Sequence, residues 1–173
     1  MTWWQKILEL LFASVSAKPA PAPEPAKPVE LPWREWFLAR LGWTEFDHDG
    51  ELSKGWHLTK DCKGYKTVIG LEHAWCGMSL ATALNSCGYA YPVACESAAA
   101  WRGYGTPIDW KARGIPKGAV VVVRGESFHV ATADRDHDPA PAYVDLLGGN
   151  QDNAIKVKRD RREIVYVGWP VKA

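Results

Sequence analysis

The sequence has almost no net charge, few cysteines and no long hydrophobic run, and each shortage excludes a class of protein. A formal net charge of +1 gives no general attraction to nucleic acid, so no nucleic-acid partner is predicted. Four cysteines in 173 residues are too sparse for a small scaffold held together by disulfides. The length suits one domain of ordinary size with a short appendage.

The appendage is predicted at the N-terminus, where residues 1–16 favour an amphipathic helix. A helix of this length reaches about 24 Å, short of the roughly 30 Å hydrocarbon core of a bilayer, so it cannot span a membrane unaided. We expect it to lie on a membrane surface or to self-associate, and a cleaved secretory signal or a helix packed on the domain are the alternatives. Its apolar face carries Trp4, Ile7, Leu8, Leu11 and Val15.

A spacer should follow this helix. Alternating prolines in residues 17–30, AKPAPAPEPAKPVE, prevent helix and sheet and favour extended polyproline. The globular domain is therefore expected to occupy residues 31–173, and to open with a helix from about Trp33 to Leu41 that ends at Gly42.

The domain is organised around residues 72–88, EHAWCGMSLATALNSCG, which favour one helix that stops at Gly88. Cys76 would lie in its first turn, where the helix dipole and free backbone N–H groups lower the pKa of a thiol. The backbone at Cys76 and Gly77 would also hold an oxyanion formed at an attacked carbonyl. A buried structural cysteine is the alternative. Steps of three and four residues give an inward apolar stripe of Cys76, Leu80, Ala83, Leu84 and Cys87.

Partners for this cysteine are predicted downstream. The β-branched run from Val120 to Val123 is followed by a polar turn and a second strand that carries His129. A cysteine at a helix start and a histidine on a later strand are typical of a thiol hydrolase, in which the imidazole takes the thiol proton. The next predicted strand ends in Gly148-Gly149-Asn150-Gln151, and the glycine turn would let Asn150 reach back to His129. Asp145, on that strand, is the competing third residue.

These motifs, in this order, resemble the phage-type NlpC-like and CHAP (cysteine, histidine-dependent amidohydrolase/peptidase) cell-wall hydrolases. The resemblance covers roughly Leu31 to Pro170 and implies an α+β, papain-like (NlpC/CHAP-type) fold with the cysteine helix packed on an antiparallel sheet. Carried over by position, Cys76 would be the nucleophile, His129 the base and Asn150 the third polar residue. The motifs are AWCGMSLATALNSCGY, SAAAW, GIPKGAVVVV, FHVA and LLGGNQ.

The chain also departs from the family. Many NlpC-like members have Asp before the cysteine and Ser after it, where this chain has Trp75 and Gly77, and many use a second histidine as the third residue.

The function that the resemblance implies is cleavage of an amide bond in bacterial peptidoglycan, either the muramoyl-alanine amide or a peptide cross-link. A phage or prophage lysin, made in the host cytoplasm and acting on the cell wall, is the leading role. A secreted antibacterial amidase and a catalytically silent binding or assembly module of a phage particle are the alternatives. Trp75 and Trp101 are expected to offer aromatic surfaces to the substrate.

Four further segments carry smaller expectations. Residues 47–51, DHDGE, have the oxygen ligands and glycine of a calcium loop but not the full EF-hand spacing, so no metal or cofactor is predicted. Cys87 and Cys95 would either pair or remain thiols. Residues 96–103 favour a short helix that walls the cleft. The basic run 156–162, KVKRDRR, is read as a solvated strand edge and turn rather than a site for an anionic polymer.

Overall fold

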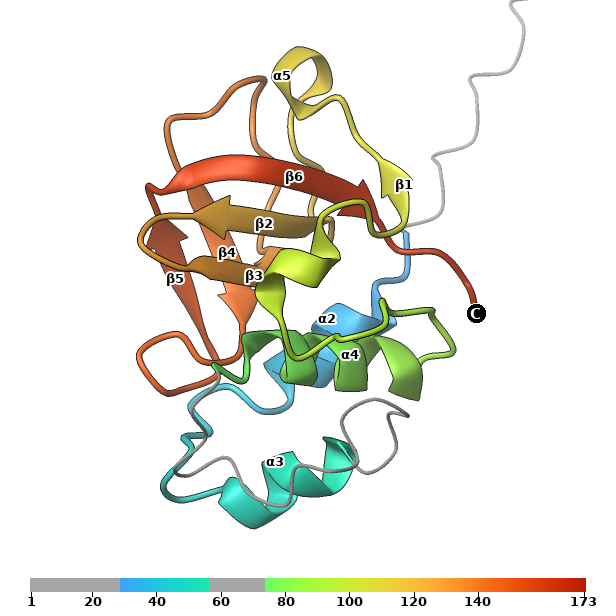
Figure 1. Ribbon diagram of the computed structural model, residues 1–173. Coiled ribbons are helices and arrows are strands. Elements are labelled where there is room, and N and C mark those ends of the chain that lie inside the picture. Colours follow the sequence, from blue (N-terminus) through green and yellow to red (C-terminus); the bar gives the residue numbers. More distant parts are fainter. Residues whose placement is uncertain (1–28, 57–73) are drawn as a thin grey trace, which may run out of the picture. The chain divides into compact units, whose positions relative to one another are not determined.

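The computed structural model describes residues 29–56 and 74–173 (Figure 1). Contacts divide the chain into two units, Met1–Glu30 and Leu31–Ala173, and the described helices and strands all belong to the second. The predicted N-terminal helix and most of the predicted spacer lie outside the described residues. Within the described ranges, no helix has both the length and the apolar character needed to cross a membrane.

A six-stranded antiparallel sheet forms the centre of the second unit, in the order β1-β6-β2-β3-β4-β5. The chain is therefore α+β, with the predicted strands around Val120, His129 and Leu147 confirmed. The basic run at 156–162 also forms a strand at the sheet edge and the turn after it, as predicted. The strands are β1 (Thr106–Pro107), β2 (Val120–Arg124), β3 (Phe128–Ala133), β4 (Val144–Gly148), β5 (Lys156–Asp160) and β6 (Glu163–Trp169).

The valine run of β2 is uninterrupted because both faces of this strand are covered. Val120 and Val122 pack in a core with α4 (Cys76–Ser86), whereas Val121 and Val123 pack in a second core on the opposite face. A strand buried on both faces reads as a continuous apolar run instead of an alternating one. The β2–β3 pairing sets Val123 opposite His129, which places the histidine one pair away from the turn that joins these two strands.

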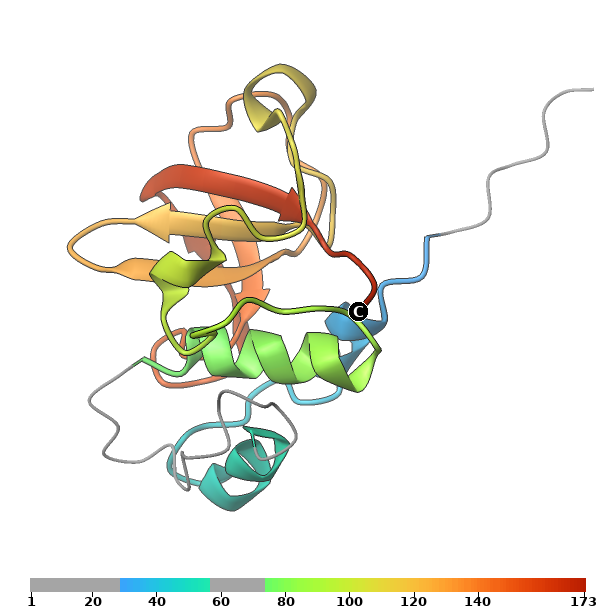
Figure 2. The same ribbon diagram turned by 45° about the vertical axis from the view of Figure 1, so that its right-hand side comes forward.

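Helices cover the sheet on the side of α4, which contacts β3 and β4 and lies between the sheet and α3 (Figures 1 and 2). Every residue of α4 from Cys76 to Leu84 is buried, because α2, α3 and η1 also pack against this helix. The predicted inward stripe is confirmed except at Cys87, which is half-exposed beyond the last turn. The helices are α2 (Pro32–Leu38), α3 (Asp49–Trp56), α4, the 3₁₀ helix η1 (Ala98–Trp101) and α5 (Trp110–Arg113).

The bounds of the first helix need correction, because it ends at Leu38 and the chain continues in turns up to Gly42, which has a φ of +85°. Residues 49–51, for which no metal was predicted, form the first turn of α3, and Asp47 accepts a hydrogen bond from the Thr44 hydroxyl at 2.9 Å. The thiol of Cys87 is free, so the alternative of a bond between Cys87 and Cys95 is excluded.

Candidate active site

Cys76 is the first residue of α4 and is only 1% exposed. Burial raises the pKa of its thiol, while the backbone N–H groups of Val130 and Gly77 act in the opposite direction. The predicted lowering by the helix start is therefore present but is outweighed by desolvation. The contact with Val130 is informative, because it places the sulfur beside the strand residue that directly follows His129.

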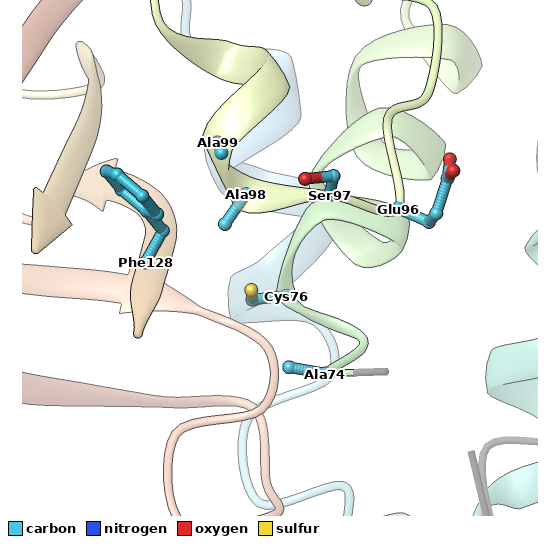
Figure 3. A pocket seen from close by; sticks show the side chains of 7 residues that line it. All are labelled: Ala74, Cys76, Glu96, Ser97, Ala98, Ala99 and Phe128. Atoms are coloured by element: carbon cyan, nitrogen blue, oxygen red, sulfur yellow. The ribbon is translucent and has the colours of Figure 1, made fainter. Parts of the chain in front are cut away.

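A pocket of about 330 Å³ opens at Cys76, and Figure 3 shows the sulfur directed toward its Ala98 and Phe128 side. The segment from Glu96 to Ala99 forms one wall, which confirms the predicted role of this segment as a cleft wall. Phe128 forms the opposite side, and it was not among the predicted site residues, although its place beside His129 was the available signal.

His129 is 6% exposed, and the pKa of its imidazole is lowered to about 4, mainly by burial. The nearby positive charges of Arg162 and Lys158 contribute to this lowering, whereas Asp160 and an interaction with the Gln151 side chain act in the opposite direction. At neutral pH the imidazole is therefore uncharged, which is the form that can accept a proton.

The side chain that holds this imidazole is that of Gln151, which is 3% exposed. Its amide nitrogen donates to the carbonyl oxygens of Leu146 at 3.1 Å and Lys156, so the amide oxygen is left to accept from the ring. Nε2 of His129 is buried and has no hydrogen-bond partner within the described residues.

The two residues predicted for this role, Asn150 and Asp145, form no hydrogen bond with the imidazole in the described residues. Asn150 has a φ of +56° and lines the His129 pocket, but no hydrogen bond between its side chain and His129 is present in the described part of the chain. Asp145 accepts hydrogen bonds from Arg135 at 2.7 Å and Arg159 at 2.9 Å and is committed to them. The glycine turn therefore brings the residue after Asn150 to the imidazole.

The turn can approach α4 because Gly149 has no side chain. A Cβ on Gly149 would lie 2.4 Å from both the Ser79 hydroxyl and the ring of Trp75. The end of β4 thus lies directly against the first turns of the cysteine helix.

Neither tryptophan predicted to bind substrate offers a surface. Trp75 is 1% exposed and donates its indole N–H to Glu45 at 2.8 Å, and Trp101 is fully buried and donates to the Cys95 carbonyl at 2.9 Å. Both rings are core residues that fix the start of α4. The same packing explains Gly77, since a Cβ there would lie 2.0 Å from the Cys95 oxygen.

His129 lines a second pocket of about 430 Å³, which shares Ala74 and Phe128 with the Cys76 pocket. Strand alternation puts the side chains of Phe128 and His129 on opposite faces of β3. The thiol and the imidazole thus line neighbouring pockets, and no hydrogen bond joins them in residues 29–56 and 74–173. Such bonds are often long before substrate binds.

No family model matches the sequence, and no curated protein or solved structure matches it either.

Proposed function

We propose that this chain is a papain-like cysteine hydrolase that cleaves an amide bond in bacterial peptidoglycan. The observation that carries the proposal is the placement of Cys76, at the start of a buried helix and against the backbone of the residue that follows His129. A thiol at a helix start and a neutral imidazole in the neighbouring pocket are the parts that nucleophilic catalysis requires. Peptidoglycan as the substrate comes from the motif resemblance.

In the proposed reaction, Nε2 of His129 takes the proton from Sγ of Cys76, and the sulfur attacks the carbonyl carbon of the scissile amide. The oxygen of that carbonyl becomes an oxyanion that accepts from the backbone N–H groups of Cys76 and Gly77. The imidazolium then gives its proton to the leaving nitrogen, and a thioester remains on Cys76. His129 next removes a proton from water, which attacks the thioester, and the returning proton regenerates the thiol as the acid is released.

The resting pair is uncharged, because burial raises the pKa of Cys76 and lowers that of His129. Charge separation therefore has to be stabilised while the substrate is bound. The groups positioned to do so are the N–H of Val130 for the sulfur, and Gln151 with Asp160 for the imidazolium.

A catalytically silent binding or assembly module is the second candidate. It is favoured by one observation, namely that the thiol and the imidazole are both buried in uncharged form and share no hydrogen bond in the described residues. A lysin and a secreted antibacterial amidase would use the same site chemistry, so they differ in biological setting only.

The test compares wild-type protein with Cys76→Ala and with Cys87→Ala, a matched thiol loss at the half-exposed end of the same helix. Each full-length protein is incubated with purified peptidoglycan, and the released fragments are identified by mass spectrometry. We expect the wild type and Cys87→Ala to release the same fragments and Cys76→Ala to release none, while circular dichroism shows all three folded.

The new termini on the fragments name the bond that is cleaved. Release by Cys76→Ala at the wild-type rate would overturn the thiol mechanism. A wild-type protein that binds peptidoglycan and releases nothing would favour the silent module.

A further inference from the structure

The pocket that His129 lines carries an excess of positive charge that the proposed catalysis does not use. Its lining includes four cationic side chains against two carboxylates, and its volume is about 430 Å³. The cations come from the end of β5 and the turn into β6, a segment that the sequence alone favoured as a solvated edge. They are Lys158, Arg159, Arg161 and Arg162, and the carboxylates are Asp152 and Asp160.

Most of these cations already have partners. Arg162 pairs with the buried Asp160 at 2.5 Å, and Lys158 pairs with Asp152. Arg159 pairs at 2.9 Å with Asp145, a carboxylate outside the pocket lining.

Arg161 is different, because within the described residues it forms no ion pair. Its recorded contact is with the Tyr143 ring, 5.9 Å from the guanidinium carbon, and its side chain is exposed. An arginine in this state keeps its hydrogen-bond donors available for an anion.

We propose that this pocket binds a carboxylate of an acidic peptide whose scissile amide lies at Cys76. The proposal rests on the proposed hydrolase function and names its substrate class. A planar carboxylate matches the fork of the Arg161 guanidinium and would gain from the excess of cations over carboxylates in the pocket lining.

The position of the basic pocket supports the binding of a peptide that spans this pocket and the Cys76 pocket. Ala74 and Phe128 border both pockets, so a peptide with one group in the basic pocket can place a neighbouring group of the same peptide at Cys76. The floor of the basic pocket is ordered, since Gln151 and Asp160 are both buried and hydrogen-bonded. A pocket of this size, with one arginine that lacks an ion pair, suits a single anionic group more than a polyanion.

Binding is measured without turnover in full-length Cys76→Ala protein by isothermal titration calorimetry. The probes are the tripeptide L-alanyl-γ-D-glutamyl-L-lysine and its counterpart in which the α-carboxylate of glutamate is a carboxamide. We expect the carboxylate form to bind on the order of tenfold more tightly at low salt, and the preference to shrink as ionic strength rises.

Adding Arg161→Gln to this background should remove most of the preference. Arg113→Gln, the same charge loss on α5, serves as the control and should leave it unchanged. Arg162 is not substituted, because its loss would leave the buried Asp160 unpaired.

Equal binding of the two peptides, no binding of either, or a preference that survives Arg161→Gln would each overturn the proposal. Hydrolysis by the wild type is scored separately on peptidoglycan. If the wild type hydrolyses peptidoglycan but Cys76→Ala shows no preference for the carboxylate peptide, only this inference is overturned. If the preference is present but the wild type does not hydrolyse, the carboxylate site stands, while the hydrolase function and the scissile amide at Cys76 are overturned.

Discussion

Acidification should destabilise the folded domain through His129 at a higher pH than through the ion-paired carboxylates Asp145 and Asp160. The imidazole has a pKa of about 4 in the folded chain, below the 6.5 expected when it is solvated after unfolding. Between these values the unfolded state binds more protons, so the free energy of unfolding falls as the pH falls. The stabilisation from the neutral imidazole is complete above pH 6.5 and is lost as the pH drops through 4.

The size of this effect follows from the shift. Because the side chain is almost fully buried, solvent screening takes little away, and the loss between pH 7.5 and pH 4.5 is about 2.5 kcal/mol. The pKa values of Asp145 and Asp160 are lowered in the folded chain, by hydrogen bonds from Arg159 and from Arg162 respectively. Their stabilisation is present above the solvated value of 3.8 and is lost only at lower pH, so the two effects occupy different windows.

The assay is urea denaturation at a series of pH values, followed by the fluorescence of the ten tryptophans. The matched variant is His129→Gln, which keeps a polar side chain but does not titrate. We expect the wild type to lose about 2.5 kcal/mol more than this variant over the same pH range. His137, whose pKa is also lowered by partial burial, contributes to both proteins and cancels in the difference. Identical pH dependence in the two proteins would refute the buried, neutral imidazole.

Two further substitutions test the packing of the site. Gln151→Ala removes the acceptor for the imidazole N–H and should lower the rate of peptidoglycan hydrolysis by about ten to a hundredfold. Asn150→Ala should keep the rate within about twofold of the wild type. Equal rates for the two variants would mean that neither side chain orients the imidazole of His129. Gly77→Ala should cost about 2 kcal/mol or more in thermal or urea unfolding, because its Cβ meets the Cys95 oxygen, while Gly50→Ala in open space on α3 should be neutral or slightly stabilising. Wild-type stability in Gly77→Ala would mean that the backbone there shifts freely.

The elements that the sequence predicts well are those specified locally. The valine run at 120–123 predicts a strand because β-branched residues favour extended backbone, and it continues without polar breaks since both faces are buried. The cysteine helix is specified by its Ala, Leu and Met content and by Gly88, which has a φ of +73°. Such signals need no knowledge of distant residues.

The identity of the side chain that faces the imidazole depends on the path of a turn. Asn150, Asp152 and Asn153 all have positive φ, at +56°, +51° and +60°. These left-handed residues rotate the chain, so strand alternation carried forward from β4 no longer says which side chain points to His129. For this reason Asn150, and not its neighbour Gln151, was predicted as the residue that orients His129.

Burial by distant segments was the other missing information. The start of α4 correctly indicates backbone donors near Cys76, but the sign of the net pKa shift depends on how closely β3 and η1 enclose it. The same holds for Trp75 and Trp101, whose indoles are fixed by Glu45 and by the Cys95 carbonyl. Aromatic content alone does not separate a core ring from a binding surface.

The basic pocket and the proposed catalytic pair, Cys76 and His129, are coupled through Arg162. Its positive charge lowers the pKa of both His129 and Cys76, which weakens the base while it favours the thiolate. A substrate carboxylate placed beside this arginine would offset the charge and raise the pKa of the imidazole, so the base strengthens when the pocket is filled. The carboxylate would then act on the rate of the chemical step as well as on binding, because the imidazolium formed in that step would meet less repulsion. A pair that is uncharged in the resting protein is consistent with this scheme, since its full basicity is reached with substrate in place.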